Sequence, residues 1–359
     1  MKLFQRLQSF FDSLKVDLCM ISGTCKSNGR QASLVCGVGK KTLHYLADLI
    51  FEPGCRFDQL GSAWLWSAER RARRSAPEAL LLFIESGGRK LRLFNDSWIN
   101  IPVWVRSEIA LPMPEAIQKR QSFRSDLSNI CKASYTHQVT RDPALIEDFY
   151  HQMYLPYVGS SHGDSAILKS KELLLSEFGS PELLLIKQGQ TAIAGVLISY
   201  EYEIPKIFAL GIREDKFEHL RHGALFACYY FALAHLGNAG YQRVSAGSSK
   251  GFIRDGVLNY KHKFGHRLVE PQELCLLLKR LQTTAKATEL LRELPVICQR
   301  NGLLYSLVFV NNEELKTLQR SAKARSKFFV PGSEALLACN LDSQENSSGH
   351  SFITLEEKH

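Results

Sequence analysis

The chain has 359 residues, of which 45% are hydrophobic and 23% are charged, which is an ordinary globular composition. Its formal net charge of +9 favours anionic partners without choosing among them. The nine cysteines form no C-x-x-C pair and mostly lie in apolar runs, as free thiols do in a reducing compartment, so neither disulfides nor a metal site is expected. No run is long enough for a membrane span or a signal peptide, which predicts a cytoplasmic protein.

The first region, residues 1–120, is expected to be an N-terminal α/β lobe. Residues 32–39 read as a strand and 40–51 as a helix. Residues 78–86 and 89–96 are apolar runs on either side of Gly87 and Gly88, which predicts a hairpin. This lobe is compatible with a degenerate copy of the unit that follows it.

The second region, residues 121–271, has the clearest pattern. The order is a strand, two helices, three strands, a long helix and two final strands; the expected ranges are 133–140, 143–158, 164–179, 182–203 (two strands), 206–212, 215–240, 242–249 and 258–270. Helices in this order must cover a sheet, which predicts an α/β (α+β) protein.

The third region, residues 272–341, is expected to be a small C-terminal α/β extension. Residues 273–294 are predicted to form a helix, followed by a strand at 303–312 and a second helix at 313–329. The polar tail 342–359 is expected to be disordered.

Two sites could bind an anion at a helix start. "GVGKKT" (Gly37 to Thr42) departs from both the P-loop and the dinucleotide-binding pattern, and a tight strand-to-helix turn is favoured there. "EHLRHGALF" (Glu218 to Phe226) follows a strand, and its helix start could hold a pyrophosphate or be a solvent-facing first turn.

Three further stretches offer polar side chains that could contact a ligand. "SAGSSKGFIRDG" contains Ser248, Ser249 and Lys250 after a strand, although a flexible loop explains it equally well. "YLPYVGSSHGD" could line a substrate pocket with Tyr157, His162 and Asp164, or lie exposed in a loop. Glu203 is a candidate general base only because of its place at a strand end.

"YKHKFG", Tyr260 to Gly265, resembles the Phe-Lys-x-x-Phe-Gly strand of the FemAB/CelD type of the GNAT acyltransferases. The resemblance extends over residues 121–271 and implies a splayed mixed sheet flanked by helices. It also implies that acyl-CoA pyrophosphate binds at Arg221, His222, Gly223 and Ala224, and that Lys261, with Tyr260 before it, faces the reaction channel. Leu220 departs from the phosphate-binding pattern of the family, and a short linking segment replaces the helix usual before the last strand.

This resemblance implies an N-acyltransferase that uses acetyl-CoA or another acyl-CoA. The acceptor would be an amine, for example on an amino sugar or a surface-polysaccharide or cell-envelope precursor. One alternative keeps the fold with aminoacyl-tRNA as donor, as in FemAB-type enzymes, and another is a non-catalytic binding module. For Lys261 and Lys263, the alternative to a channel is the solvent-facing side of an alternating strand.

Overall fold

The computed structural model describes residues 14–162, 170–172, 174, 181–201, 203–213, 218–271, 273–343 and 352–357. The chain forms two compact units, and neither is a continuous stretch of sequence. The first unit consists of Met1–Val105, Ser249–Leu258 and Leu268–His359, and the second of Arg106–Ser248 and Asn259–Arg267. Most of the expected N-terminal lobe and the whole expected C-terminal extension therefore belong to the same unit, the first.

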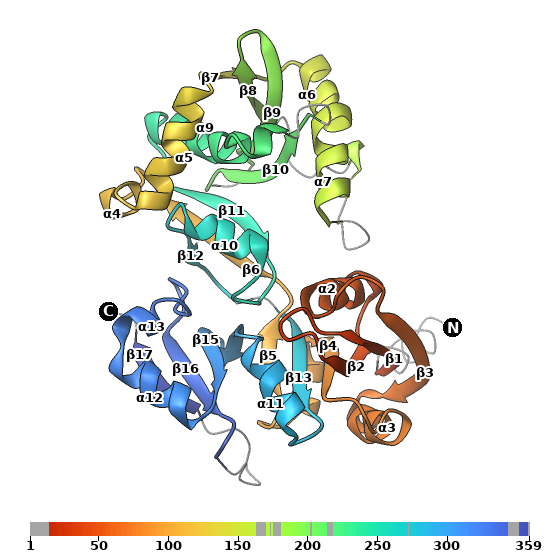
Figure 1. Cartoon of the computed structure of the whole chain (residues 1–359). Coiled ribbons are helices and arrows are strands. Elements are labelled where there is room, and N and C mark those ends of the chain that lie inside the picture. Colours follow the sequence, from red (N-terminus) through yellow and green to blue (C-terminus); the bar gives the residue numbers. More distant parts are fainter. Residues whose placement is uncertain are drawn as a thin grey trace. The chain divides into compact units, whose positions relative to one another are not determined.

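The first unit contains a six-stranded mixed sheet (Figure 1). Its order is β3 (Arg56–Trp64), β1 (Lys15–Thr24), β2 (Gln31–Gly37), β4 (Leu81–Gly87), β13 (Leu274–Arg280) and β5 (Ile99–Pro102). Alternate side chains of β4 enter two different cores, with Phe83 on one face and Ile84 on the other. Helix α2 (Lys40–Ile50) buries Leu46 and Ile50 in the core that contains Phe83.

A second sheet of the first unit has the order β14-β15-β16-β17. Its strands are β14 (Val296–Arg300), β15 (Leu303–Val310), β16 (Ala335–Asn340) and β17 (Phe352–Glu357). The first unit also contains α3 (Ala68–Ser75), α11 (Ala285–Arg292), α12 (Asn312–Arg320) and α13 (Ala322–Arg325). Helix α12 starts with a capping box in which Asn311 and Glu314 exchange hydrogen bonds. The single helix predicted over 313–329 is wrong, because the extended backbone of Ser321 separates α12 from α13.

The second unit is built on a seven-stranded mixed sheet, β12-β6-β11-β10-β9-β8-β7. The strands are β6 (Val105–Ala110), β7 (Tyr135–Thr140), β8 (Glu182–Gln188), β9 (Thr191–Ser199), β10 (Lys206–Ile212), β11 (Arg243–Ser249) and β12 (Arg267–Leu268). Its helical segments are α4 (Glu115–Gln118), α5 (Gln121–Lys132), α6 (Pro143–Phe149), the π-helix η3 (Tyr150–Tyr154), α7 (Leu155–His162) and α9 (Ala224–Asn238). Helix α10 (Gly256–His262) begins in the first unit and continues into the second from Asn259.

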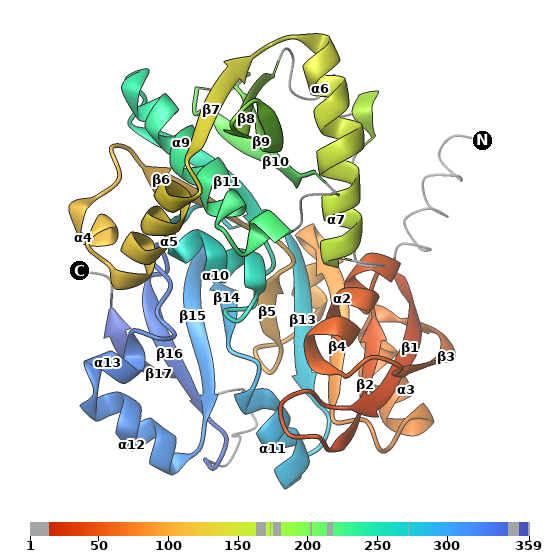
Figure 2. The ribbon, with the colours of Figure 1, turned by 45° about the horizontal axis from the view of Figure 1, so that its top comes forward.

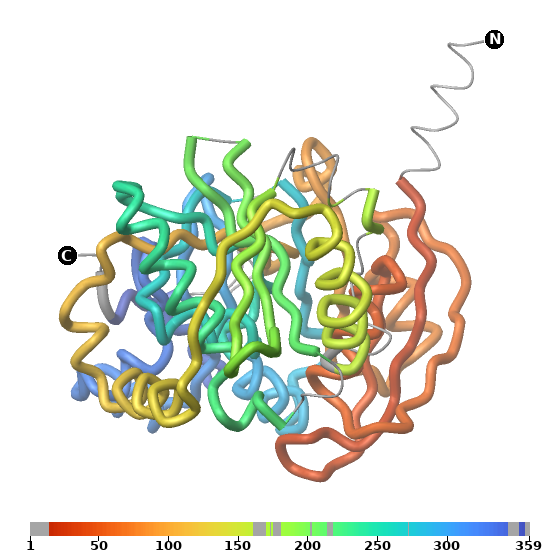
Figure 3. The backbone as a smooth tube through the Cα atoms, turned by 90° about the horizontal axis from the view of Figure 1, so that it is seen from above, coloured from red at the N-terminus to blue at the C-terminus, as the bar shows by residue number. Residues whose placement is uncertain are grey.

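Helices cover both faces of this second sheet. On one face α9 packs with Leu184 and Val196, and on the other α6 and η3 pack with Leu183 and Leu197 (Figures 2 and 3). Consecutive side chains of β8 and β9 are buried and point alternately to the two faces, so both strands contribute to both cores. The predicted α/β class, with mixed sheets flanked by helices, is confirmed.

The stretch Tyr260 to Gly265 is the end of a helix followed by a turn, which corrects the predicted strand over 258–270. Helix α10 ends at His262 and a turn continues to Gly265, so only Arg267–Leu268 forms a strand, β12. Leu258, Lys261 and Phe264 are buried at a spacing of three residues, which is close to the helical period of 3.6 and far from the strand period of two. The alternation of aromatic and basic residues hid that period.

Three further expectations need correction. Residues 273–294 are not one helix, because a strand buried on both faces, β13, reads as a continuous apolar run before α11. Residues 89–96 do not form a hairpin strand; Gly88–Leu93 is a 3-10 helix. Residues 352–357 of the tail form β17, because Ile353 and Leu355 pack against the core. The helix predicted at 164–179 lies mostly outside the described residues.

Candidate functional site

The start of helix α9 has no capping side chain within the described residues. Gly223 precedes the helix with a left-handed backbone, φ 85°. Arg221 and His222 are exposed beside it, while Ala224 is buried. Uncapped N–H groups and the helix dipole both favour negative charge at such a helix start.

Strands β10 and β11 are parallel but share a single register pair within the described chain, Lys206 with Ser245. The amide of Ser245 also donates to the Pro205 carbonyl at 2.8 Å. Both contacts lie at or before the first residue of β10, so the pairing does not continue along it. The chain then leaves β10 for the start of α9, as the predicted splayed sheet requires.

Lys261 of α10 is the only lysine among the buried residues of the described chain, with 2% of its surface exposed. Its Nζ donates to the carbonyl oxygen of Ser248, near the end of β11, at 3.0 Å. Lys263 differs: its Nζ pairs with Asp126 at 2.6 Å. The solvent-facing alternative is therefore wrong for Lys261. A buried ammonium is costly unless hydrogen-bonded, and it is a strong donor where water is scarce.

The aromatic residues on either side of Lys261 pack on the first turns of α9. The Phe264 ring stacks on Tyr229 at 4.9 Å and on Phe226 at 5.3 Å between centroids, and Tyr260 lies 5.7 Å from Tyr229. The expectation that the aromatics of the motif pack inward is thus confirmed. Phe264 shares one core with Ala224 and Phe226 at the α9 start.

Tyr260 is a hydrogen-bond donor rather than a base at neutral pH. Burial is the main cause that raises its pKa far above the usual range, and the nearby Tyr229, Cys228, Asp126 and Tyr157 raise it further. Tyr157 of α7, predicted to contact substrate, therefore lies within electrostatic range of the motif.

Two buried histidines in this unit were not predicted. His266 follows the motif, and its Nδ1 lies 3.0 Å from the Ser107 hydroxyl. Burial, with smaller effects of His262 and Lys261, lowers its pKa to about 3, so it is neutral at pH 7. His219, four residues before Gly223, forms a 2.7 Å hydrogen bond with the Tyr135 hydroxyl. The sequence gives no pattern for His266, whereas His219 belongs to the stretch already proposed for anions.

Another polar cluster lies at the C-terminal end of α9. Glu182 accepts hydrogen bonds from Tyr200 at 2.6 Å and His235 at 2.8 Å, and His235 is in the last turn of the helix. Burial opposes ionisation of Glu182, but these hydrogen bonds and charges outweigh it and lower its pKa. The cluster fastens the helix C-terminus to β8 and is remote in sequence from the helix start.

Several predicted site residues do not join this group. Ser249 and Lys250 belong to the first unit, where Lys250 contacts Tyr45 and Trp104. Glu203 is exposed between β9 and β10, so its role as a base still depends on position alone. His162 ends α7 but its side chain is outside the described part, as is all of Asp164.

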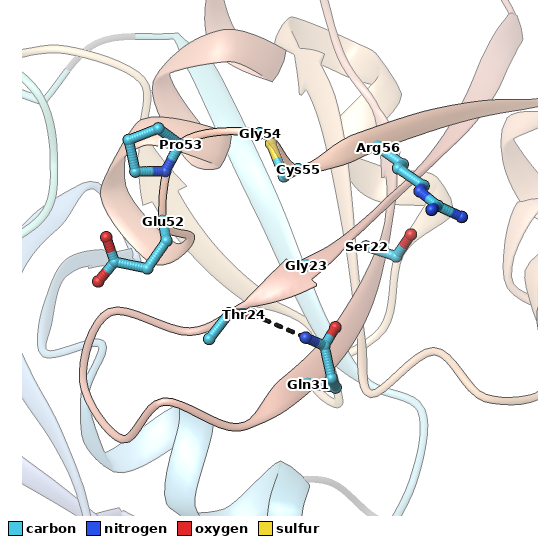
Figure 4. A pocket seen from close by; sticks show the side chains of 9 residues that line it. All are labelled: Ser22, Gly23, Thr24, Gln31, Glu52, Pro53, Gly54, Cys55 and Arg56. Atoms are coloured by element: carbon cyan, nitrogen blue, oxygen red, sulfur yellow. Dashed lines mark hydrogen bonds between the residues drawn. The ribbon is translucent and has the colours of Figure 1, made fainter.

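A cavity of about 390 Å³ lies at one edge of the first unit (Figure 4). Its lining is mostly polar and comes from β1, the start of β2 and the turn before β3: Ser22, Gly23, Thr24, Gln31, Glu52, Pro53, Gly54, Cys55 and Arg56. None of these residues belongs to a predicted site. In the described ranges no group of three potential metal ligands occurs, and no helix has the length and apolar character to cross a membrane.

Comparison with known proteins gives structural similarity alone. No protein-family model and no curated protein matches the chain. Among solved structures, L-PGS from Bacillus licheniformis is 12% identical with a TM-score of 0.36, covering 62% of this chain and 74% of its own. FemX is 12% identical with a TM-score of 0.34, covering 68% and 80%. A GCN5-related N-acetyltransferase from Sphaerobacter thermophilus is 13% identical with a TM-score of 0.31, covering 70% and 73%.

Proposed function

We propose that the second unit is an N-acyltransferase that moves an acyl group from an acyl-CoA to an amine. The observation that carries the proposal is the buried Lys261, whose neighbour Phe264 packs on the first turns of the uncapped helix α9. The start of α9 would receive the pyrophosphate of the donor, with Arg221 and His222 adding positive charge. The acceptor, for example an amino sugar of a cell-envelope precursor, would supply the amine.

In the reaction the acceptor nitrogen forms a bond to the acyl carbon, the carbon–sulfur bond breaks, and CoA leaves as the thiol after taking up the proton that the amine loses. Negative charge develops on the acyl oxygen as the amine attacks. Lys261 and the hydroxyl of Tyr260 are the donors proposed to stabilise that charge. Both are fixed by packing before substrate binds, which is what such stabilisation needs. Catalysis would otherwise depend on positioning.

The test is the variant Lys261→Met, which keeps the length of the side chain and removes its charge. Removing one donor to a developing oxyanion lowers transfer roughly 100-fold or more. Acyl transfer from acetyl-CoA and longer acyl-CoAs would be followed by thiol release in the presence of amino-sugar acceptors. Circular dichroism would show that the variant is folded.

Lys132→Met in α5 is the matched control, because Lys132 is exposed and lies in the same unit. Thermal melts with acyl-CoAs and with aminoacyl-tRNA identify the donor, since a ligand that binds the folded state raises the melting temperature. Stabilisation by the tRNA alone would move the proposal to the aminoacyl-tRNA donor. Stabilisation by generic polyanions alone would refute the enzyme. Wild-type turnover in a folded Lys261→Met would instead remove Lys261 from the proposed site.

A further inference from the structure

Lys250 lies in the first unit in a setting that its sequence did not suggest. Its Nζ is 3.9 Å from the centre of the Trp104 ring and 5.2 Å from that of Tyr45. Within the described chain the ammonium has no hydrogen-bond or ion-pair acceptor. Cation–π contact stabilises the charge but leaves its three N–H donors without acceptors.

Two carboxylates lie within electrostatic range of this ammonium, and they differ in what they bind. Asp255 is occupied: it accepts from the Tyr45 hydroxyl at 3.2 Å and from the Leu258 amide at 2.9 Å. Glu85, near the end of β4, is not occupied, because its Oε2 is buried without any hydrogen-bond partner in the described residues. Burial lowers the pKa of Lys250 to about 8, while Glu85 and then Asp255 oppose that effect.

Glu85 Oε2 lies near the start of α2. A side chain at Gly39, the residue before the helix, would come within 3.9 Å of Oε2. The start of α2 gives Oε2 no hydrogen bond. Glu85 and Lys250 form no ion pair in the described structure, although opposite charges are present. An ammonium over two aromatic rings and a buried carboxylate oxygen, both without hydrogen-bond partners in the described residues, are groups that a polar molecule could satisfy.

We propose that the Lys250–Glu85 cluster binds a small zwitterion of the α-amino acid type. Lys250 would donate to the carboxylate of the ligand, Glu85 Oε2 would accept from its ammonium group, and Trp104 and Tyr45 would form the wall beside it. Each contact satisfies a group that the folded chain leaves open. The site belongs to the first unit alone and is independent of acyl transfer.

The experiment is isothermal titration calorimetry of the full chain with the twenty L-amino acids. For the best binder, the matched amine without the carboxylate and the matched acid without the amine are then titrated. We expect the complete amino acid to bind at least tenfold more tightly than either part. Lys250→Met and Glu85→Gln are each expected to weaken binding at least tenfold.

Lys286→Met and Glu78→Gln, both exposed in the first unit, serve as controls and should bind like the wild type. Lys261→Met should bind normally, which separates this site from the proposed transfer reaction. The proposal is overturned if no amino acid binds at millimolar concentration, which would leave the two groups to ordered water. It is also overturned if a folded Lys250→Met or Glu85→Gln retains full affinity, or if the amine or the acid alone matches the amino acid.

Discussion

His266 shows how one side chain can make stability depend on pH. With 1% of its surface exposed and the Ser107 hydroxyl at Nδ1, it is neutral when folded, and its pKa is lowered from 6.5 to about 3. In the unfolded chain the same imidazole takes up a proton near pH 6.5. Between pH 6.5 and pH 3 the unfolded state therefore binds more protons, and acid favours unfolding.

We predict that lowering the pH from 7 to 5 lowers the free energy of unfolding by about 2 kcal/mol through His266 alone. The stability that comes from keeping this imidazole neutral is complete above the pKa of the unfolded chain and declines as the pH falls below it. Urea unfolding of the wild type and of His266→Asn at both pH values measures the effect. The asparagine amide can replace Nδ1 toward Ser107 but does not titrate. An equal loss of stability in both proteins would contradict the prediction.

Strand β10 and the π-helix η3 meet at a glycine. A methyl group at Gly211 would lie 2.5 Å from the carbonyl carbon of Met153 and 2.6 Å from the amide nitrogen of Tyr154. Both atoms are backbone, so the two elements must move apart. We predict that Gly211→Ala lowers the free energy of unfolding by about 3 kcal/mol, at the upper end of the range for overpacking.

Gly237→Ala in α9 is the matched control for the same change. Nothing lies within 4 Å of a methyl group there, and the residue is helical. Alanine should therefore stabilise the protein by about 0.5–1 kcal/mol through helix propensity. Denaturant unfolding of both variants decides the matter, and a Gly211→Ala protein as stable as the wild type would show that the elements do not touch as closely.

At the level of elements, sequence patterns predicted those whose signals are local. The β8–β9 hairpin, β10, α9 and β11 have clear periodicity, turn residues or a closing glycine, and all were predicted. Helix α10 and β13 were not, because tertiary contacts decide them: Phe264 packs on α9, and β13 is buried between two partner strands. The sequence also did not predict that Ser248 and Lys250 belong to different units. The point where a chain passes from one unit to the other has no local sequence pattern.

For the molecule as a whole, the first sheet depends on a strand from far along the chain. Strand β13 lies between β4 and β5 and pairs antiparallel with both. We predict that a fragment of residues 1–120 fails to fold, because it would expose the unpaired edges of both strands, and such edges promote aggregation.

Soluble yield, size-exclusion chromatography and circular dichroism would test that fragment against the intact chain. Supplying residues 268–359 by co-expression should restore solubility, because they contain β13 and the second sheet of the first unit. A fragment that is monomeric and melts cooperatively by itself would show that the N-terminal lobe is an independent domain.

The division into two units has an optical consequence. All four tryptophans, Trp64, Trp66, Trp98 and Trp104, lie in the first unit. Tryptophan fluorescence therefore reports on the first unit alone, because the second unit, which contains Lys261, has no tryptophan. Phe231 of α9 is partly exposed, and replacing it with tryptophan would allow unfolding of the second unit to be followed by fluorescence.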